Sequence, residues 1–438
     1  MCISLPVPVL KIIAELRQAG YRALAAGEGL RDCLLGLVPQ DLMVLTDAPP
    51  EIVDALFDRV LPPQESSGPL TVWESGVTVG VICQVDDPAG ELRSFDFTVN
   101  ALAYDPFSDL LIDPWQVCKS LCSGRGVIQG AVDPAARFQE DPSRLLGVFY
   151  LMKRFDDARL KWMVDPGTWD ALVECVPLAR TIPSEMVAAG LNKIIVGQRP
   201  EIYLEEMRKC GILKIIIPEL AATYGIEQSD YHIKDVFGHT LLVMKEIRPE
   251  LHLRWAALLH DIGKPHCISF EAESVHFYGH QVISSVMSRH ILKRFKYSRD
   301  FIEKVSFLVL NHMYPTPRTR KAVRRFTIKI GLKNLGDLLE LRRADIMGGK
   351  YKNIGRLEYF KKQIDAVLFE LPPFSLRDLA VDGFDAMKVL GLKPGPGVGG
   401  ALQFLFEKVI EDPDLNQRET LIKILKEDYH PFMAVRKS

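Results

Sequence analysis

The chain has 438 residues, of which 47% are hydrophobic and 25% are charged, and its formal net charge at pH 7 is −2. A chain of this length is expected to form roughly two to four domains, because a single core rarely grows beyond about 250–300 residues. No apolar run reaches the roughly 18 residues that a bilayer span requires. The small net charge argues against general coating of a polyanion. We therefore expect a cytoplasmic globular protein with no membrane segment.

Neither secretion nor a cysteine framework is indicated. The N-terminal stretch MCISLPVPVLKII has no basic region and no small-residue cleavage site. The eight cysteines are scattered, and only Cys118 and Cys122 lie close together, without a second pair that would complete a zinc site. Reduced thiols are the simplest interpretation.

The first 130 residues predict a small mixed α/β head. Residues 5–20 have the periodicity of an amphipathic helix, and β-rich runs follow, among them YRALAAG, DLMVLTD, LTVWESGVTVGVICQV and FTVNALAYDP. From about residue 131 onward the strand pattern disappears and helical periodicity replaces it. The proline-rich stretch 369–378 is typical of a linker into a helical tail. The expected fold class is α+β, a small mixed-sheet head followed by all-helical segments.

The middle of the chain contains six residues of metal-ligand type, each in an apolar helical segment. They are His239, His260, Asp261, His280, His312 and Asp345. An imidazole or carboxylate in such a segment is costly unless it is paired or bound to a metal. One histidine of this kind is more often a satisfied core residue, but six of them favour a metal site over that alternative. Imidazoles with carboxylates suit manganese, nickel, iron, zinc or magnesium.

This pattern resembles the HD phosphohydrolase superfamily, in which a histidine, a His-Asp pair and a distant aspartate converge in a helical bundle. The matching residues are His239, His260, Asp261 and Asp345. His280 and His312 match the additional histidines of members that bind two metals. The resemblance implies metal-dependent hydrolysis of a phosphoester, with His260 and Asp261 as catalytic residues. Lys264, in the string HDIGK, would stabilise negative charge in the transition state, or would be a surface lysine at a helix end; both interpretations stay open.

The chain as a whole resembles the bacterial tRNA nucleotidyltransferase and poly(A) polymerase family, the CCA-adding enzymes. The matching strings are GEGLRDCLLG, DLMVLT, FDFTVNALAYDP, LLIDPW, ARFQEDPSRLL and the tail string VDGFDAMKVLGLKPGPGVGG. The resemblance implies a nucleotidyltransferase-like head (1–130), a nucleotide-selecting and RNA-binding neck (131–225), an HD domain (226–368) and an RNA-contacting tail (369–438). It implies RNA, in the form of tRNA or a tRNA-like molecule, as the partner.

The nucleotide site of the head matches this family incompletely. The Asp-x-Asp pair that holds magnesium in the family is represented by Asp41 and Met43, and a thioether cannot hold a hard cation. The paired glycines of the phosphate turn are Gly27 and Glu28, and the glutamate adds a charge that repels phosphate. Asp47 would restore the strand parity, but it lies about 20 Å from Asp41 along an extended chain.

Further positions of the head and neck also lack the residues of the family pattern. Ser94 and Phe95 stand where the family has arginines, the loop before them is short, and Gly147 and Tyr150 replace arginines of the neck. These substitutions predict a weakened or inactive head. The matching positions, which the resemblance assigns to nucleotide binding, are Gly27, Arg31, Asp32, Asp41, Asp96, Asn100, Asp141 and Arg144.

The stretch 318–333, RTRKAVRRFTIKIGLK, has seven arginines or lysines and no acid. A phosphate-binding surface and a solvated helix face both fit this pattern. Because the region holds tRNA in the family, the resemblance assigns RNA binding to Arg320, Lys321, Arg324 and Arg325.

These observations favour an RNA end-processing protein with a working HD phosphohydrolase site and a weakened nucleotidyltransferase head. One alternative is an active tRNA nucleotidyltransferase or poly(A) polymerase, which would use magnesium with ATP or CTP. A second alternative is a non-catalytic tRNA-binding protein. The sequence predicts neither the identity and number of the metals nor the oligomeric state.

Overall fold

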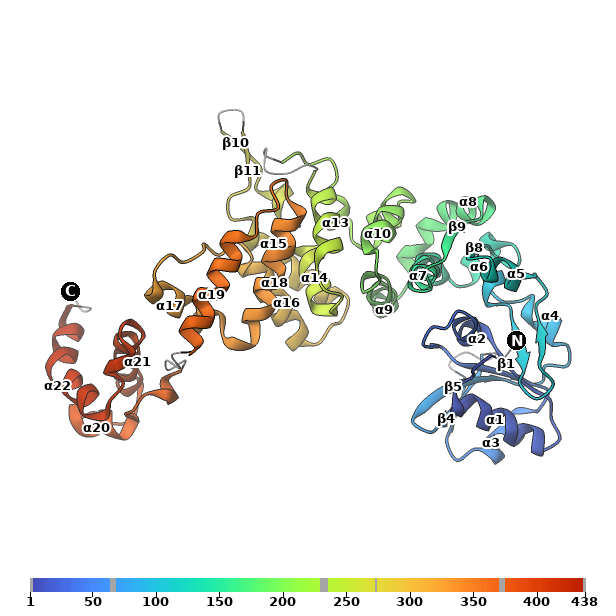
Figure 1. Ribbon diagram of the computed structural model, residues 1–438, viewed down its shortest axis with the longest axis horizontal. Helices are drawn as coiled ribbons and strands as arrows, with labels where there is room; N and C mark the ends of the chain where they lie inside the picture. Colours follow the sequence, from blue (N-terminus) through green and yellow to red (C-terminus); the bar gives the residue numbers. More distant parts are fainter. Residues whose placement is uncertain (1–2, 64–67, 229–234, 272–273, 370–374, 436–438) are drawn as a thin grey trace. The chain divides into compact units, whose positions relative to one another are not determined.

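The computed structural model describes residues 3–63, 68–228, 235–271, 274–369 and 375–435. The chain forms two compact units. The first contains Met1–Ile226, Pro249–Arg254 and His290–Ser298, and the second contains Glu227–Arg248, Trp255–Arg289 and Arg299–Ser438. Figure 1 shows the helices and strands of both units.

The first unit begins with a seven-stranded mixed sheet of strand order β3-β4-β5-β2-β1-β6-β7. Strands β2 and β5 are parallel, and the other neighbouring pairs are antiparallel. The strands are β1 (Ala23–Ala26), β2 (Met43–Thr46), β3 (Val60–Leu61), β4 (Leu70–Glu74), β5 (Val77–Ile82), β6 (Ala103–Asp105) and β7 (Leu110–Ile112). The expected α+β class with a mixed-sheet head is confirmed.

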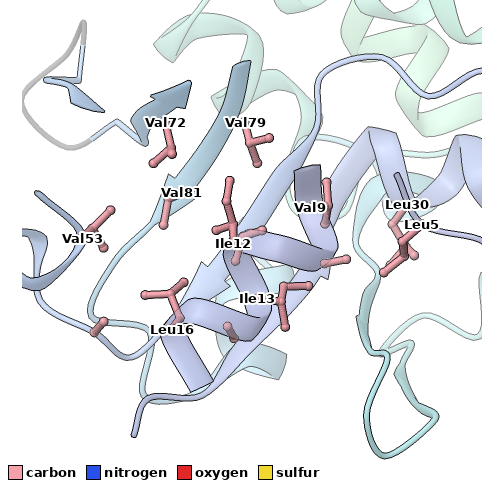
Figure 2. Packing of buried hydrophobic residues seen from close by; sticks show 14 of the residues in the cluster. Leu5, Val9, Ile12, Ile13, Leu16, Leu30, Val53, Val72, Val79 and Val81 are labelled. Carbon is pink, nitrogen blue, oxygen red and sulfur yellow. The ribbon is translucent and has the colours of Figure 1, made fainter. Parts of the chain in front are cut away.

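Helix α1 (Val7–Gln18) covers one face of this sheet. Its apolar residues recur at helical spacing, which places Val9, Ile12, Ile13 and Leu16 on one buried stripe. Figure 2 shows these side chains facing the valines of β4 and β5. Each fully buried aliphatic side chain contributes about 1.5–3 kcal/mol, so this contact stabilises the sheet that carries the predicted nucleotide-binding residues.

Short elements follow the strands of the head and lead into the neck. The elements of the head are α2 (Gly27–Leu34), α3 (Pro50–Leu56), α4 (Pro88–Leu92), the 3-10 helix η1 (Thr98–Asn100) and α5 (Val117–Cys122). Those after it are β8 (Arg125–Ile128), α6 (Pro134–Glu140), α7 (Arg144–Asp157), β9 (Lys161–Val164), α8 (Pro166–Cys175), η2 (Val176–Thr181), α9 (Ser184–Ile195), α10 (Pro200–Lys209), α11 (Ile212–Ile216) and α12 (Pro218–Ala221).

The second unit is mainly helical. Its elements are α13 (Val236–Glu246), α14 (Leu251–Leu259), η3 (Lys264–His266), β10 (Ser269–Glu271), β11 (Ser274–His276), α15 (His280–Arg294), α16 (Arg299–Asn311), α17 (Arg320–Ile330), α18 (Leu332–Gly348) and α19 (Gly355–Phe369), with the first residues of α14 and the last of α15 belonging to the first unit. The tail adds η4 (Leu376–Asp378), α20 (Gly383–Leu390), α21 (Pro396–Glu411), η5 (Pro413–Leu415) and α22 (Arg418–Val435). Within the described ranges, no helix combines the length and the apolar character needed to cross a membrane.

The prediction that strands are absent after residue 131 was wrong in two places. Strand β9 pairs in parallel with β8, and β10 forms an antiparallel hairpin with β11. Each of these strands has only three or four residues, which is too short for period-two alternation to be distinguished from a loop. Of the predicted linker 369–378, residues 370–374 lie outside the described residues, and Ser375–Asp378 form a capping box at the start of the tail.

Candidate functional site

The six candidate metal ligands come together in the second unit. His239 lies in α13, His260 and Asp261 directly follow α14, His280 begins α15, His312 directly follows α16, and Asp345 lies in α18. They form two groups, in each of which the ligand atoms lie within 4.8 Å of one another. One group is His239, His260 and Asp345, and the other is Asp261, His280 and His312.

Two glycines allow the ligand-bearing elements to approach this closely. A Cβ atom at Gly263 would lie 2.6 Å from the backbone nitrogen of Ser284, so the loop after Asp261 can pack against α15 only without a side chain there. A Cβ atom at Gly348 would lie 3.1 Å from the backbone nitrogen of Val243. This contact sets α18 against α13, the two helices that carry Asp345 and His239.

Three of the imidazole rings are oriented by backbone carbonyls. The Nδ1 atoms of His260, His280 and His312 lie 2.7–2.8 Å from the carbonyl oxygens of residues 257, 277 and 309. A carbonyl oxygen can only accept, so each Nδ1 carries the proton and donates it. In its neutral form each ring is therefore left with a lone pair on Nε2, which is the arrangement of a metal-ligating histidine. Burial lowers the pKa of His260, but the carboxylates of Asp261 and Asp345 outweigh burial and raise it.

Two of these lone pairs face each other. The Nε2 atoms of His280 and His312 are 3.4 Å apart, and those of His260 and His239 are also 3.4 Å apart. Two acceptors at this distance repel each other unless a cation or a proton lies between them. Burial, together with the charge of His260, lowers the pKa of His312 to about 4, so His312 is neutral at pH 7.

Asp261 lies between the two groups. Its Oδ2 atom is 3.2 Å from His260 Nε2, and its Oδ1 atom is 3.2 Å from His280 Nε2. Burial opposes ionisation of this carboxyl, but His260 and Lys264 outweigh burial and hold its pKa well below the usual range. Asp261 is therefore an ionised carboxylate whose two oxygens face different histidines.

Lys264 is buried, which excludes the surface interpretation left open by the sequence. Its Nζ atom lies 2.6 Å from Asp261 Oδ2 and donates to Gln228 Oε1 at 2.6 Å. Asp345 is ionised as well, because His239, at 3.0 Å, and His260 lower its pKa against the opposing effect of burial. This set of four imidazoles and two ionised carboxylates fits one or two divalent transition ions.

The predicted nucleotide site of the head has an apolar centre. Met43 and Phe95, which replace a metal ligand and an arginine of the family pattern, both pack against the same hydrophobic cluster, which includes Leu24 and Leu45. A Cβ atom at Gly27 would lie 3.6 Å from Met43 Sδ and 3.5 Å from Phe95 Cε1. A thioether and an aromatic ring thus occupy the positions where the family pattern has the second carboxylate and an arginine.

The remaining acids near this centre are held by other residues or partly neutralised. Asp41 precedes β2 in a left-handed conformation, with φ of 52°, and lies 3.3 Å from Lys193 Nζ of α9. Burial raises the pKa of Glu28, and Arg31 partly offsets this effect. Asp47 accepts a hydrogen bond from the backbone nitrogen of Arg22 at the other end of β2, so it does not replace Met43.

Three predicted nucleotide-binding residues form a buried network. Arg31 is fully buried, donates to Asn100 Oδ1 at 2.6 Å and pairs with Asp32 at 2.8 Å. Asp32 also pairs with Arg154 of α7 at 2.5 Å. Sequence reasoning missed Arg154, because no local pattern connects it with a carboxylate 122 residues away. These contacts join the sheet to the neck, and nucleotide binding by the three predicted residues stays a prediction.

The neck residues belong to an ion-pair network with the head. Asp96 lies 3.0 Å from Arg144 and 3.0 Å from Arg137, and both arginines also contact Glu140. Asp141 is half-exposed and lies 3.7 Å from Arg144. Arg137 was missed, although it stands within the quoted string ARFQED. Base reading by Asp141 and Arg144 would require Arg144 to exchange these partners.

The basic stretch is largely engaged within the second unit. Lys321 and Arg325 both pair with Glu411, and Arg324 donates to the carbonyl oxygens of Ile410 and Glu411 at 3.2 and 3.0 Å. These contacts hold α17 against the C-terminal end of α21, where cations are favoured. RNA binding by Arg320, Lys321, Arg324 and Arg325 stays a prediction, and three of the four have a structural role.

Comparisons with known proteins assign the chain to a family. The family model described as "tRNA nucleotidyltransferase domain 2 putative" matches residues 277–425, and "Probable RNA and SrmB- binding site of polymerase A" matches residues 163–223. The A-adding tRNA nucleotidyltransferase of Deinococcus radiodurans is 30% identical over 72% of this chain and 74% of its own length. The CC-adding tRNA nucleotidyltransferase of Thermus thermophilus is 32% identical over 52% of this chain. The match covers 53% of that relative, so the chain spans about half of its length.

Solved structures support the same fold. The Bacillus stearothermophilus CCA-adding enzyme in complex with CTP aligns over 98% of both chains with a TM-score of 0.73 and 22% identity. The Thermotoga maritima CCA-adding enzyme complexed with tRNA aligns over 95% of this chain and 93% of that chain, with a TM-score of 0.54 and 14% identity. These relatives are named for nucleotide addition, and neither matched family model describes a phosphohydrolase. The comparisons therefore favour nucleotide addition, the alternative interpretation, over the HD phosphohydrolase. The chain belongs to the bacterial tRNA nucleotidyltransferase family of CCA-adding enzymes.

Proposed function

We propose that this protein is a metal-dependent phosphohydrolase that acts on RNA ends, with tRNA or a tRNA-like RNA as its substrate. The observation that carries the proposal is the convergence of four imidazoles and two carboxylates from five separate segments, with three rings oriented by backbone carbonyls. The relatives support the RNA part of the proposal, because they are named for tRNA and one was solved with tRNA bound.

The two groups of ligands would hold one ion each, with Asp261 shared between them. A divalent ion held by these residues would supply a water of lowered pKa and would polarise the phosphoryl oxygens. Lys264 helps to keep the Asp261 carboxylate ionised. It would also stabilise negative charge on a phosphate bound beside Asp261. The candidate substrates are 2′,3′-cyclic phosphates, 2′-phosphates and terminal phosphomonoesters of RNA.

Nucleotide addition is the second candidate function, and the names of the relatives favour it. It would use magnesium with ATP or CTP in the head. The geometry of the head opposes it, because Met43 removes one of two metal-holding carboxylates and Lys193 pairs with the other. Loss of such a carboxylate costs several kcal/mol of transition-state stabilisation, on the order of 10²–10⁴ in rate.

The test uses the purified full-length chain, stripped with a chelator and reloaded separately with Mn²⁺, Ni²⁺, Fe²⁺, Zn²⁺ or Mg²⁺. We expect hydrolysis of bis(p-nitrophenyl) phosphate or a 2′,3′-cyclic nucleotide, with transition ions more effective than Mg²⁺, because four of the six ligands are imidazoles. His260→Ala should abolish the activity and lower the metal content. His266→Ala is the matched control, because this histidine is exposed and lies six positions along the same segment.

The outcomes distinguish the three candidate functions. Hydrolysis lost only in the His260 variant supports the proposal. Incorporation of labelled ATP or CTP into a truncated tRNA, without hydrolysis, would replace it with nucleotide addition. RNA binding by a protein that retains no metal and shows neither activity would leave a non-catalytic tRNA-binding protein.

A further inference from the structure

A cavity of about 740 Å³ lies in the second unit, between the loop after His312 and the first turns of α19. The loop contributes Thr316 and Arg318, and α19 contributes Arg356, Tyr359 and Gln363. Among the described residues that line the cavity, two are arginines and none carries a carboxylate. Its lining is therefore positively charged and includes one aromatic ring, which is the composition of a surface that binds single-stranded nucleic acid.

The three side chains of α19 that line the cavity share one face of the helix. Arg356, Tyr359 and Gln363 are separated by three and four positions, so they lie above one another on successive turns. Tyr359 is 65% exposed. Among the residues that the structure describes, Arg318 and Arg356 form no ion pair, in contrast to Lys321 and Arg325, which share Glu411. The cavity thus presents charge and ring surface that the fold does not use.

The wall of the cavity is connected to the proposed metal centre. Thr316 follows His312 by four residues, and its hydroxyl accepts a hydrogen bond from Arg342 Nη2 at 3.1 Å. Arg342 lies one helical turn before Asp345 in α18 and interacts electrostatically with that carboxylate. Its Nη1 atom is buried and has no hydrogen-bond partner in the described part of the chain. An incompletely paired positive charge therefore lies between the cavity wall and a proposed metal ligand.

We propose that this cavity binds the single-stranded terminal nucleotides of an RNA, with a base stacked on Tyr359 and the flanking phosphates bound by Arg318 and Arg356. Stacking on an aromatic side chain requires an unpaired base, so a strand end fits the cavity and a duplex does not. The claim that the bound strand is also the strand that is hydrolysed rests on the proposed function. RNA binding itself is independent of that claim.

The first test measures binding of a fluorescein-labelled single-stranded hexanucleotide RNA to the metal-free full-length chain by fluorescence anisotropy. Tyr359→Ala should weaken binding roughly 10-fold, and Tyr359→Phe should stay within about twofold of the unchanged protein, because the ring is retained. Arg318→Ala and Arg356→Ala should each weaken binding and reduce its logarithmic salt slope by about 0.7, the value per phosphate contact of a single strand.

Lys362→Ala is the matched control, because Lys362 is exposed on the same helix and lies outside the cavity. It should change neither the affinity nor the salt slope. Equal affinity of the Tyr359→Ala, Arg318→Ala and Lys362→Ala variants, or the absence of hexanucleotide binding by the unchanged protein, would overturn the proposal. Competition by AMP as strong as that by the hexanucleotide would overturn the assignment to a strand and indicate a free nucleotide.

The second test separates this proposal from the proposed function. With metal restored, two substrates are compared: a hexanucleotide that carries a 2′,3′-cyclic phosphate, and bis(p-nitrophenyl) phosphate. Tyr359→Ala should lower the ratio of kcat/KM for the hexanucleotide to that for bis(p-nitrophenyl) phosphate by roughly 10-fold, because KM for the RNA rises. An unaltered preference would contradict the role of the cavity while leaving the hydrolase intact. Normal hexanucleotide binding without any hydrolysis would contradict the hydrolase while leaving the cavity intact.

Discussion

The Nε2 atoms of His280 and His312 lie 3.4 Å apart, and the Nδ1 atom of each ring donates to a backbone carbonyl. In their neutral forms the two rings therefore direct two lone pairs at the same point in a buried region, beside an oxygen of Asp261. This arrangement is unfavourable without a cation or proton between the rings. It is the strongest physical argument for a second metal ion in addition to the one that His239, His260 and Asp345 would hold.

Removing one histidine tests the number of ions. His312→Ala leaves Asp261 and His280 as the only ligands of its group, so the bound metal should fall from two ions per chain to one, with a severe loss of hydrolysis. Elemental analysis of the purified protein measures the content. Two metal ions per chain in the variant would contradict the shared-carboxylate arrangement. One metal ion per chain in the unchanged protein, with only a mild loss of hydrolysis in the variant, would indicate a one-metal site.

Restoring the family residue in the head should not restore nucleotide addition. Met43→Asp introduces a carboxylate into the apolar cluster beside Phe95, while Asp41 remains paired with Lys193. We expect no incorporation of ATP or CTP into a truncated tRNA, and a loss of stability of about 1–3 kcal/mol from burying an unpaired polar group. Robust incorporation by this single variant would show that the head retains a complete substrate site.

The partly buried Glu28 of the head, whose side chain is 31% exposed, predicts a pH-dependent stability difference. Burial raises the pKa of Glu28 above its unfolded value, so the stability it contributes is fully present below the unfolded pKa and is lost as the pH rises through the folded pKa. Glu28→Gln keeps an acceptor for Asn100 and removes the charge. Its melting temperature relative to that of the unchanged protein should therefore be higher at pH 7 than at pH 4. A difference that is constant with pH would mean that Glu28 is solvated in the folded protein.

The contacts between α17 and α21 predict unequal effects of two substitutions. Arg324→Ala removes charged hydrogen bonds to two carbonyl oxygens and should cost roughly 1.5–3 kcal/mol of stability. Glu411→Gln removes only the exposed ion pairs to Lys321 and Arg325 and should cost about 0–1 kcal/mol. Denaturant titration of both variants checks the order. If Arg324→Ala left stability unchanged and weakened RNA binding, this side chain would belong to an RNA surface instead.

The sequence indicated which residues cluster in the second unit better than it indicated the surroundings of the predicted nucleotide site. His239, His280 and Asp345 could be recognised because each is a ligand-type residue in an otherwise apolar segment, and such a residue has few other reasons to be there. The partner of Asp41 could not be recognised, because Lys193 lies 152 residues away and no periodicity links the two. Similarly, the stretch 318–333 has the composition of a phosphate-binding surface, and only the fold shows that Glu411 neutralises part of it.

The central claim is that chemistry resides in the second unit and not in the head. The full-length chain and its Asp261→Ala and Asp41→Ala variants are each reloaded with Mn²⁺. Each preparation is then assayed for hydrolysis of a 2′,3′-cyclic nucleotide and for incorporation of ATP or CTP into a truncated tRNA. We predict that Asp261→Ala abolishes hydrolysis, that Asp41→Ala leaves it unchanged, and that no preparation incorporates nucleotide. Incorporation that Asp41→Ala abolishes and Asp261→Ala does not affect, in a protein without hydrolysis, would contradict the account.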